Sequence, residues 1–96
     1  MFTLRRSPKF KRKLRKHLKG NAQLGKRILS VLQQLERDPF YPSLKSHKVR
    51  DRQGYEAFSS YVTGDLRIIW DYAEGEVDIL DLLDIGGHEG SGKVYR

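Results

Sequence analysis

The segment Leu66-Arg67-Ile68-Ile69-Trp70-Asp71-Tyr72 decides the fold, because its β-branched and aromatic side chains predict a central β-strand. Turn sequences bound this run on both sides, Thr63-Gly64-Asp65 before it and Ala73-Glu74-Gly75 after it. Alternate side chains of a strand point to opposite faces of its sheet. Leu66, Ile68 and Trp70 are therefore expected on a face that packs against helices. Arg67 is expected on the opposite face.

Further strands are expected on both sides of this run. Residues 55–62 and 77–85 have similar compositions and are joined to it by the two turns, and residues 44–50 resemble a short polar edge strand. Residues 2–6 alternate apolar and polar side chains, which predicts one more short strand at the N-terminus. Because the later strands follow one another through tight turns, we expect a small antiparallel sheet of about three to five strands.

Two helices are expected between the first strand and the others. Ser7-Pro8 supplies an N-cap and a first-turn proline for a helix over residues 8–19, which Gly20-Asn21 ends. Apolar side chains at helical spacing predict a second helix over residues 22–37. The short connection predicts an antiparallel helical hairpin. We expect residues 1–96 to form one α+β domain in which this hairpin packs on the sheet.

Charge is distributed unevenly along the 96 residues. Lys and Arg number 19 and Asp and Glu 12, so the net charge is +7. Residues 1–52 hold 16 of the bases and 3 of the acids (+13), and residues 53–96 hold 3 bases and 9 acids (−6). A basic surface of this kind favours a polyanionic partner, above all nucleic acid, because Lys and Arg neutralise phosphates. The alternative is a solvated surface that aids solubility.

Several classes of protein are excluded or disfavoured. The chain has no Cys, so disulfides and cysteine-based zinc sites are excluded, and its three His residues do not have a metal-binding spacing. No apolar run approaches the roughly 20 residues that span a bilayer. Since the basic N-terminus lacks the apolar core of a secretory signal, we expect a cytoplasmic protein without a membrane partner.

Some side chains can carry acid–base or phosphate chemistry. His88 follows two glycines just past the last expected strand and is suited to proton transfer near neutral pH. Arg67 can bind a phosphate with its forked guanidinium, and Asp65 or His47 can act as a base. The alternatives are an exposed loop His for His88, an ion pair with a nearby acid for Arg67, a turn-forming role for Asp65 and a solvated His47.

Basic and aromatic residues elsewhere are candidates for RNA binding. Tyrosines can stack on bases or pack in the core. His17 lies on the basic helix and is expected to be a surface residue. The candidate RNA-binding residues are Lys9, Arg12, Lys13, Lys16, Lys45, Lys48, Arg50, Tyr61 and Lys93.

Together these residues fit a ribonuclease site that uses no metal and no small-molecule cofactor. RNA carries its own nucleophile, the 2′-hydroxyl. Cleavage then needs a base, a cation that stabilises the phosphorane and an acid for the leaving 5′-oxygen. A small basic domain can supply all three.

Three features of the chain resemble the RelE/ParE toxin superfamily: the order of elements, the Leu66–Trp70 strand and the ending Asp84-Ile85-Gly86-Gly87-His88-Glu89-Gly90-Ser91-Gly92-Lys93-Val94-Tyr95. The ending is most similar to RelE-type and YafQ-type mRNA interferases. The resemblance covers essentially the whole chain. It implies a toxin of a type II toxin–antitoxin pair that cleaves mRNA on the ribosome, an endoribonuclease silenced by a cognate antitoxin.

The resemblance also implies roles for single residues. Arg67 matches the family's phosphate-stabilising arginine, His88 the position of a catalytic His or Arg, and Tyr95 a C-terminal aromatic that orients the substrate. Asp65 and His47 match acid and His positions of the YafQ-like branch. The paired lysines of RelE are missing from residues 55–58. The general base is therefore left open among Asp65, His47 and a group of the ribosome or RNA.

Two other functions compete with this one. The same fold class includes ParE-like toxins, which inhibit DNA gyrase and have no nuclease site. The chain can also be a nucleic-acid-binding module in which the basic helices carry affinity without catalysis. The combination of His88, Arg67 and Tyr95 favours the nuclease, since a gyrase inhibitor has no need of a proton donor beside a stacking aromatic.

Overall fold

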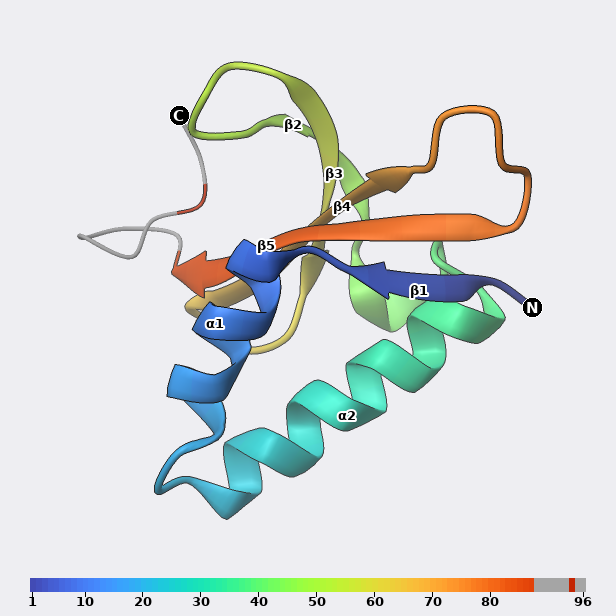
Figure 1. Ribbon diagram of the computed structural model, residues 1–96. Helices are drawn as coiled ribbons and strands as arrows, with labels where there is room; N and C mark the ends of the chain where they lie inside the picture. The colour runs from blue at the N-terminus through green and yellow to red at the C-terminus, as the bar shows by residue number, and fades with distance from the viewer. Residues whose placement is uncertain (88–93, 95–96) are drawn as a thin grey trace.

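The computed structural model describes residues 1–87 and residue 94. Two helices lie against a five-stranded sheet, which confirms the expected α+β class (Figure 1). In chain order the elements are β1 (Thr3–Arg6), α1 (Pro8–Leu18), α2 (Ala22–Arg37), the 3₁₀ turn η1 (Pro42–Leu44), β2 (His47–Arg50), β3 (Glu56–Tyr61), β4 (Leu66–Tyr72) and β5 (Ile79–Gly87).

The sheet has the strand order β1-β5-β4-β3-β2. Strands β2 to β5 form the expected antiparallel meander. The prediction of a purely antiparallel sheet is wrong for β1, which pairs parallel to β5 in the register Leu4↔Leu80. An ion pair between Arg5 and Asp81, which are partners in this register, supports the pairing at 2.6 Å. The direction of β1 depends on a partner far along the chain, so local alternation cannot reveal it.

The helices begin where their capping residues predict. Ser7 caps α1 by accepting a hydrogen bond from the Phe10 N–H (3.1 Å), and Asn21 caps α2 by accepting one from the Leu24 N–H (3.0 Å). Helix α1 ends at Leu18, one residue earlier than expected, and α2 has the expected bounds. The two arms of the hairpin diverge from their short connection, so α1 lies beside the end of β5 while α2 runs beneath the sheet (Figure 1).

The bounds of β1, β2, β3 and β5 differ from the prediction, those of β2 and β5 by two residues or more. The expected strand over residues 44–50 begins only at His47, because Pro42 starts a 3₁₀ turn that includes Leu44. The last strand continues to Gly87, two residues beyond the expected end. That extension brings a pair of glycines into the sheet beside the start of β4, where Leu66 pairs with Gly87.

The main core lies between the helices and one face of the sheet. Leu66, Ile68 and Trp70 all belong to it, as their alternation predicts. Trp70 satisfies its indole N–H by donating to Ser60 Oγ at 2.7 Å. A second, smaller cluster on the opposite face consists of Ala57, Ile69 and Val94. The central strand therefore separates a helix-covered face from a helix-free face.

Truncating the centre of the main core should destabilise the fold strongly. Ile68 is fully buried in β4, so Ile68→Ala is expected to lower the free energy of unfolding by about 2–5 kcal/mol. Val77→Ala is the matched control, because Val77 is 93% exposed and its truncation should change stability by less than about 0.5 kcal/mol. Urea denaturation followed by circular dichroism measures both. Equal stabilities for the two variants would contradict the assigned core.

Candidate functional site

The Arg67 side chain projects from the central strand β4 and is held in place by nearby backbone oxygens and an aromatic ring. Its Nη1 donates to the backbone oxygens of Thr63 and Leu66, the latter at 3.2 Å. The guanidinium also lies 4.9 Å from the ring centroid of Tyr61, its register partner on β3. Both hydrogen bonds use Nη1. A guanidinium fixed in this way is suited to bind a phosphate.

Tyr61 contacts a second cation as well. The Nζ of Lys45 lies 5.3 Å from the ring centroid of Tyr61, so this ring is in contact with both a lysine and an arginine. Cation–π contacts of this kind contribute about 0.5–2 kcal/mol each, depending on solvation. The sheet therefore places Tyr61 beside Arg67, and Lys45, which follows η1, contacts the same ring.

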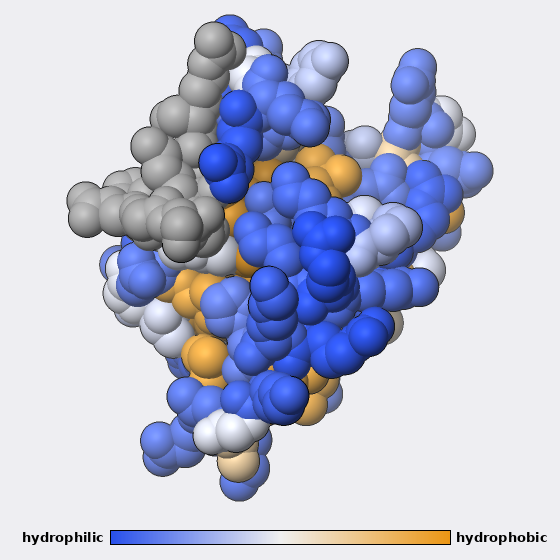
Figure 2. All heavy atoms as spheres, turned by 60° about the vertical axis from the view of Figure 1, so that its left-hand side comes forward, coloured by the Kyte–Doolittle hydropathy of each residue, from blue (hydrophilic) through white to orange (hydrophobic). Residues whose placement is uncertain are grey.

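A strongly basic cleft opens beside α1. It has a volume of about 570 Å³ and lies between α1, the end of β5 and the turn that joins β2 to β3. Figure 2 brings this side of the molecule forward and shows that hydrophilic residues cover most of it. Among the described residues, the cleft is lined by Lys9, Arg12, Lys13, Lys16, His17, Arg52, Gly86 and Gly87.

Gly86 links the cleft to Arg67. It lines the cleft and is also the register partner of Arg67 on the neighbouring strand. Because a glycine has no side chain, a ligand can approach the backbone closely at this point. Gly86 therefore joins the cleft to the strand that carries Arg67, whose guanidinium extends toward the Tyr61 ring and the Thr63 oxygen.

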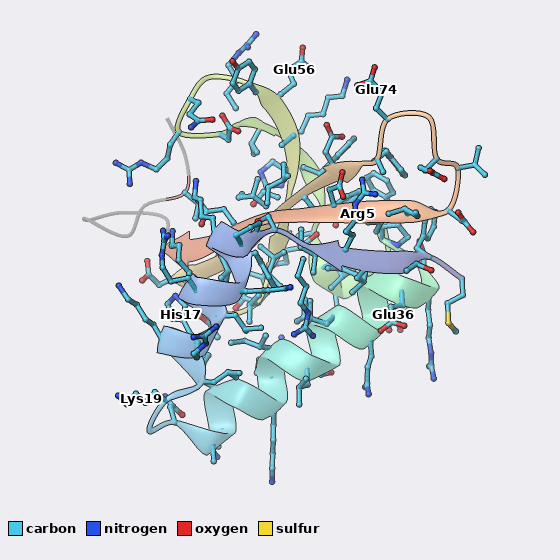
Figure 3. The ribbon with its side chains drawn as sticks, in the orientation of Figure 1. Arg5, His17, Lys19, Glu36, Glu56 and Glu74 are labelled. Carbon is cyan, nitrogen blue, oxygen red and sulfur yellow. The ribbon has the colours of Figure 1, made fainter. Side chains whose placement is uncertain are left out.

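His17 is the titrating group of the cleft. Burial lowers its pKa below the ordinary value of about 6.5, and the neighbouring charge of Lys13 lowers the pKa further. Figure 3 labels the side chain on α1. At neutral pH the imidazole is uncharged, and a bound phosphate would favour its protonation. His17, expected from the sequence to be a surface residue, is half-buried in this cleft.

The other sequence candidates lie in separate places. His47 is exposed on the edge strand β2, where its Nδ1 lies 2.9 Å from the Lys45 carbonyl oxygen. Asp65 is exposed in the turn before β4. Lys48 lies 3.7 Å from Glu56 across the β2–β3 pair, and Arg50 donates to the Gly54 oxygen at 2.9 Å. The structure thus brings Arg67 and Tyr61 together, whereas Lys48 and Arg50 serve local contacts in the hairpin.

Three candidates, His88, Lys93 and Tyr95, lie outside the described residues. The Val94 N–H donates to the Gly87 oxygen at 3.0 Å, and the Val94 side chain is fully buried against the second cluster.

Sequence reasoning missed Arg52, His17 and Asp84, which pairs with two lysines of α1. The spacing of Lys9, Lys13 and His17 by four residues places them on one helix face, a signal that would have included His17. Arg52 follows from no local pattern, because its place at the cleft depends on how the β2–β3 hairpin curls.

Two further properties concern the described residues as a group. No group of three or more His, Asp or Glu side chains in them could hold a metal ion. No helix in this part of the chain is long and apolar enough to cross a membrane.

Several solved structures superpose on nearly the whole chain. A YoeB/ParE toxin from Agrobacterium tumefaciens matches with a TM-score of 0.71 and 16% identity, covering 93% of this chain and 100% of its own. A YoeB–YefM complex from Staphylococcus aureus matches with a TM-score of 0.69 and 13% identity, covering 93% and 99%.

A copper-bound mutant toxin from Helicobacter pylori matches with a TM-score of 0.67 and 19% identity, covering 92% of this chain and 96% of its own. The chain has the RelE/ParE toxin fold. No family model and no curated protein matches the sequence. The toxin fold expected from the sequence is confirmed by these superpositions.

His17 should make stability depend on pH in a defined direction. Its pKa is lower in the folded than in the unfolded chain, so the unfolded chain binds the proton more readily and stability falls as pH drops below about 6.5. His17→Gln should reduce this loss. Urea unfolding at pH 7.5 and pH 5.5 measures the difference, and an unchanged pH dependence in the variant would refute the assignment.

Proposed function

We propose that this chain is the toxin of a toxin–antitoxin pair and that it is an endoribonuclease, cleaving mRNA on the ribosome and thereby inhibiting translation. The observation that carries the proposal is a cleft lined by cations at Gly86, the strand partner of Arg67, whose guanidinium is held by two backbone oxygens. Both features suit a sugar-phosphate chain. The fold shared with YoeB and ParE toxins supports the same class of function.

The reaction we propose uses the RNA's own 2′-hydroxyl. A base takes its proton, the oxygen attacks the adjacent phosphorus, and the bond to the 5′-oxygen breaks, leaving a 2′,3′-cyclic phosphate and a 5′-hydroxyl. Arg67 stabilises the charge on the phosphorane, a role in which one oriented donor contributes about 10²–10³ in rate. His88 protonates the leaving oxygen, Tyr95 orients the substrate, and Asp65 or His47 is the candidate base. A group of the ribosome or of the RNA is the alternative base, and no small-molecule cofactor takes part in the proposed reaction.

RNA binding divides into two regions in this proposal. The α1 residues Lys9, Arg12, Lys13 and Lys16 bind backbone phosphates in the cleft, and Lys45 and Tyr61 act beside Arg67. Lys48, Arg50 and Lys93 add positive charge around them. Since each neutralised phosphate releases counterions, affinity should fall steeply with salt.

The proposed partner is an acidic antitoxin segment in the cytoplasm. A YoeB toxin occurs in complex with YefM in a matching structure. The +13 charge of residues 1–52 offers a surface for a negatively charged segment, which would cover the cations that RNA needs.

A gyrase inhibitor is the second candidate function, because one matching structure is described as a YoeB/ParE toxin. Primer extension on cellular mRNA after induction separates the two. We expect cuts within translated codons. We also expect His88→Ala to abolish both these cuts and the growth arrest. Intact mRNA with stalled or broken DNA would establish the gyrase reading, and intact mRNA and DNA would leave only a binding module.

Arg67 offers a direct test of the chemistry. Arg67→Ala should lower the cleavage rate at saturating RNA by about 10²–10³, since the phosphorane loses its oriented donor. Arg67→Lys should recover only a small part, because an ammonium lacks the planar fork. Arg37→Ala is the control: it removes the same charge from an exposed position in the last turn of α2. Equal rates for Arg67→Ala and Arg37→Ala would contradict the role of Arg67.

A further inference from the structure

Asp84 is a buried carboxylate that the proposed reaction does not use. It lies on β5, and its side chain is only 4% exposed. Its two oxygens face two lysines of α1, with Lys13 Nζ 2.7 Å from Oδ1 and Lys9 Nζ 3.3 Å from Oδ2. Oδ1 also accepts a hydrogen bond from the Ile85 N–H at 2.9 Å. One acid thus engages two cations on successive turns of a helix.

Burying the Asp84 carboxylate beside two lysines costs free energy, so the three charged groups are stable only in a defined geometry. Removing a carboxylate from water is unfavourable unless charges and hydrogen bonds replace the lost solvation. Two lysines four residues apart on a helix also repel each other. Asp84 offsets both costs, and it holds the two ammonium groups at one point, with Lys13 mostly buried (18% exposed) and Lys9 more open to solvent (44% exposed).

The position of this cluster connects it to the cleft. Lys9 and Lys13 both line the cleft, and so does Gly86, which follows Asp84 by two residues on the same strand. Gly86 is in turn the register partner of Arg67. The carboxylate therefore ties the basic wall of the cleft to the strand end at which the guanidinium lies.

We propose that Asp84 is a positioning residue for the RNA substrate: it fixes Lys9 and Lys13 so that a phosphate chain in the cleft is presented to Arg67 at Gly86. This inference rests on the proposed function. Without Asp84 the lysines still attract phosphate, since their charges remain, but they no longer hold the strand in one register. The rate at saturation should fall, whereas the affinity should not.

The experiment compares Asp84→Asn with Asp81→Asn. Asp81 is the matched control, because it lies on the same strand, loses the same charge and is ion-paired with Arg5 at 2.6 Å. Figure 3 shows Arg5 in the sheet, away from His17 on the cleft helix. Cleavage of ribosome-bound mRNA gives the rate at saturation, and a 2′-O-methyl RNA that cannot be cleaved gives the Kd.

Asp84→Asn should lower the saturating rate at least about tenfold while its Kd stays within about threefold of that of Asp81→Asn. Asp81→Asn should stay within about twofold of the wild type in both measurements. Equal rates for the two variants would overturn the positioning role. If the wild type itself cuts no RNA, the proposed function fails instead, so the two failures are distinct.

A second comparison covers the case in which Asp84→Asn does not fold. In a Lys9→Met, Lys13→Met background the two ammonium groups are gone, and replacing Asp84 by Asn no longer leaves them without a partner. Asp84→Asn should then change the saturating rate by less than about twofold. A further tenfold loss in this background would show that Asp84 does not act through the lysines, and circular dichroism confirms that each variant is folded.

Discussion

The parallel pairing of β1 with β5 is the constraint on which the site depends. It brings the end of β1 beside the later part of β5, where the Ser7 N–H donates to the Leu82 oxygen (3.1 Å) and Ser7 Oγ donates to the Leu83 oxygen (3.2 Å). The same Ser7 caps α1. One residue thus fixes the start of the most basic helix against β5, the strand that ends in Gly86 and Gly87, and the cleft forms where the two meet. An antiparallel β1 would deliver α1 to the opposite end of the sheet.

The central strand β4 then divides two tasks between its faces. Ile68 and Trp70 face the helices and carry the main core. Arg67 faces the other side, where Tyr61 and two backbone oxygens hold it. The register shift opposite Ile69 and Trp70 leaves one extra residue, Leu83, in the neighbouring strand β5, where a bulge bends the strand. In the proposed function, stability and chemistry therefore come from the same seven residues without competing for the same side chains.

Local signals explain how much of the fold could be predicted from the sequence. Ser7-Pro8, the apolar spacing of α2 and the turns around β4 each act over a few residues, and the structure agrees with them closely. The direction of β1 could not be predicted, because it depends on β5, more than 70 residues away. Asp84 was missed for the same reason: an acid in a strand is typical of an exposed position, and only the packing of α1 shows that it is buried and paired. Arg67 was found because a lone base in an apolar strand is unusual in any fold.

We propose that this fold cuts RNA by presenting one phosphate to a fixed guanidinium, with the RNA supplying the nucleophile. A single 2′-deoxy substitution at the scissile nucleotide of an mRNA programmed on the ribosome tests this claim most directly. We predict that the substituted mRNA binds as before and is not cut, while the unmodified mRNA gives a 2′,3′-cyclic phosphate and a 5′-hydroxyl. Cleavage of the 2′-deoxy mRNA at the same position would contradict the claim.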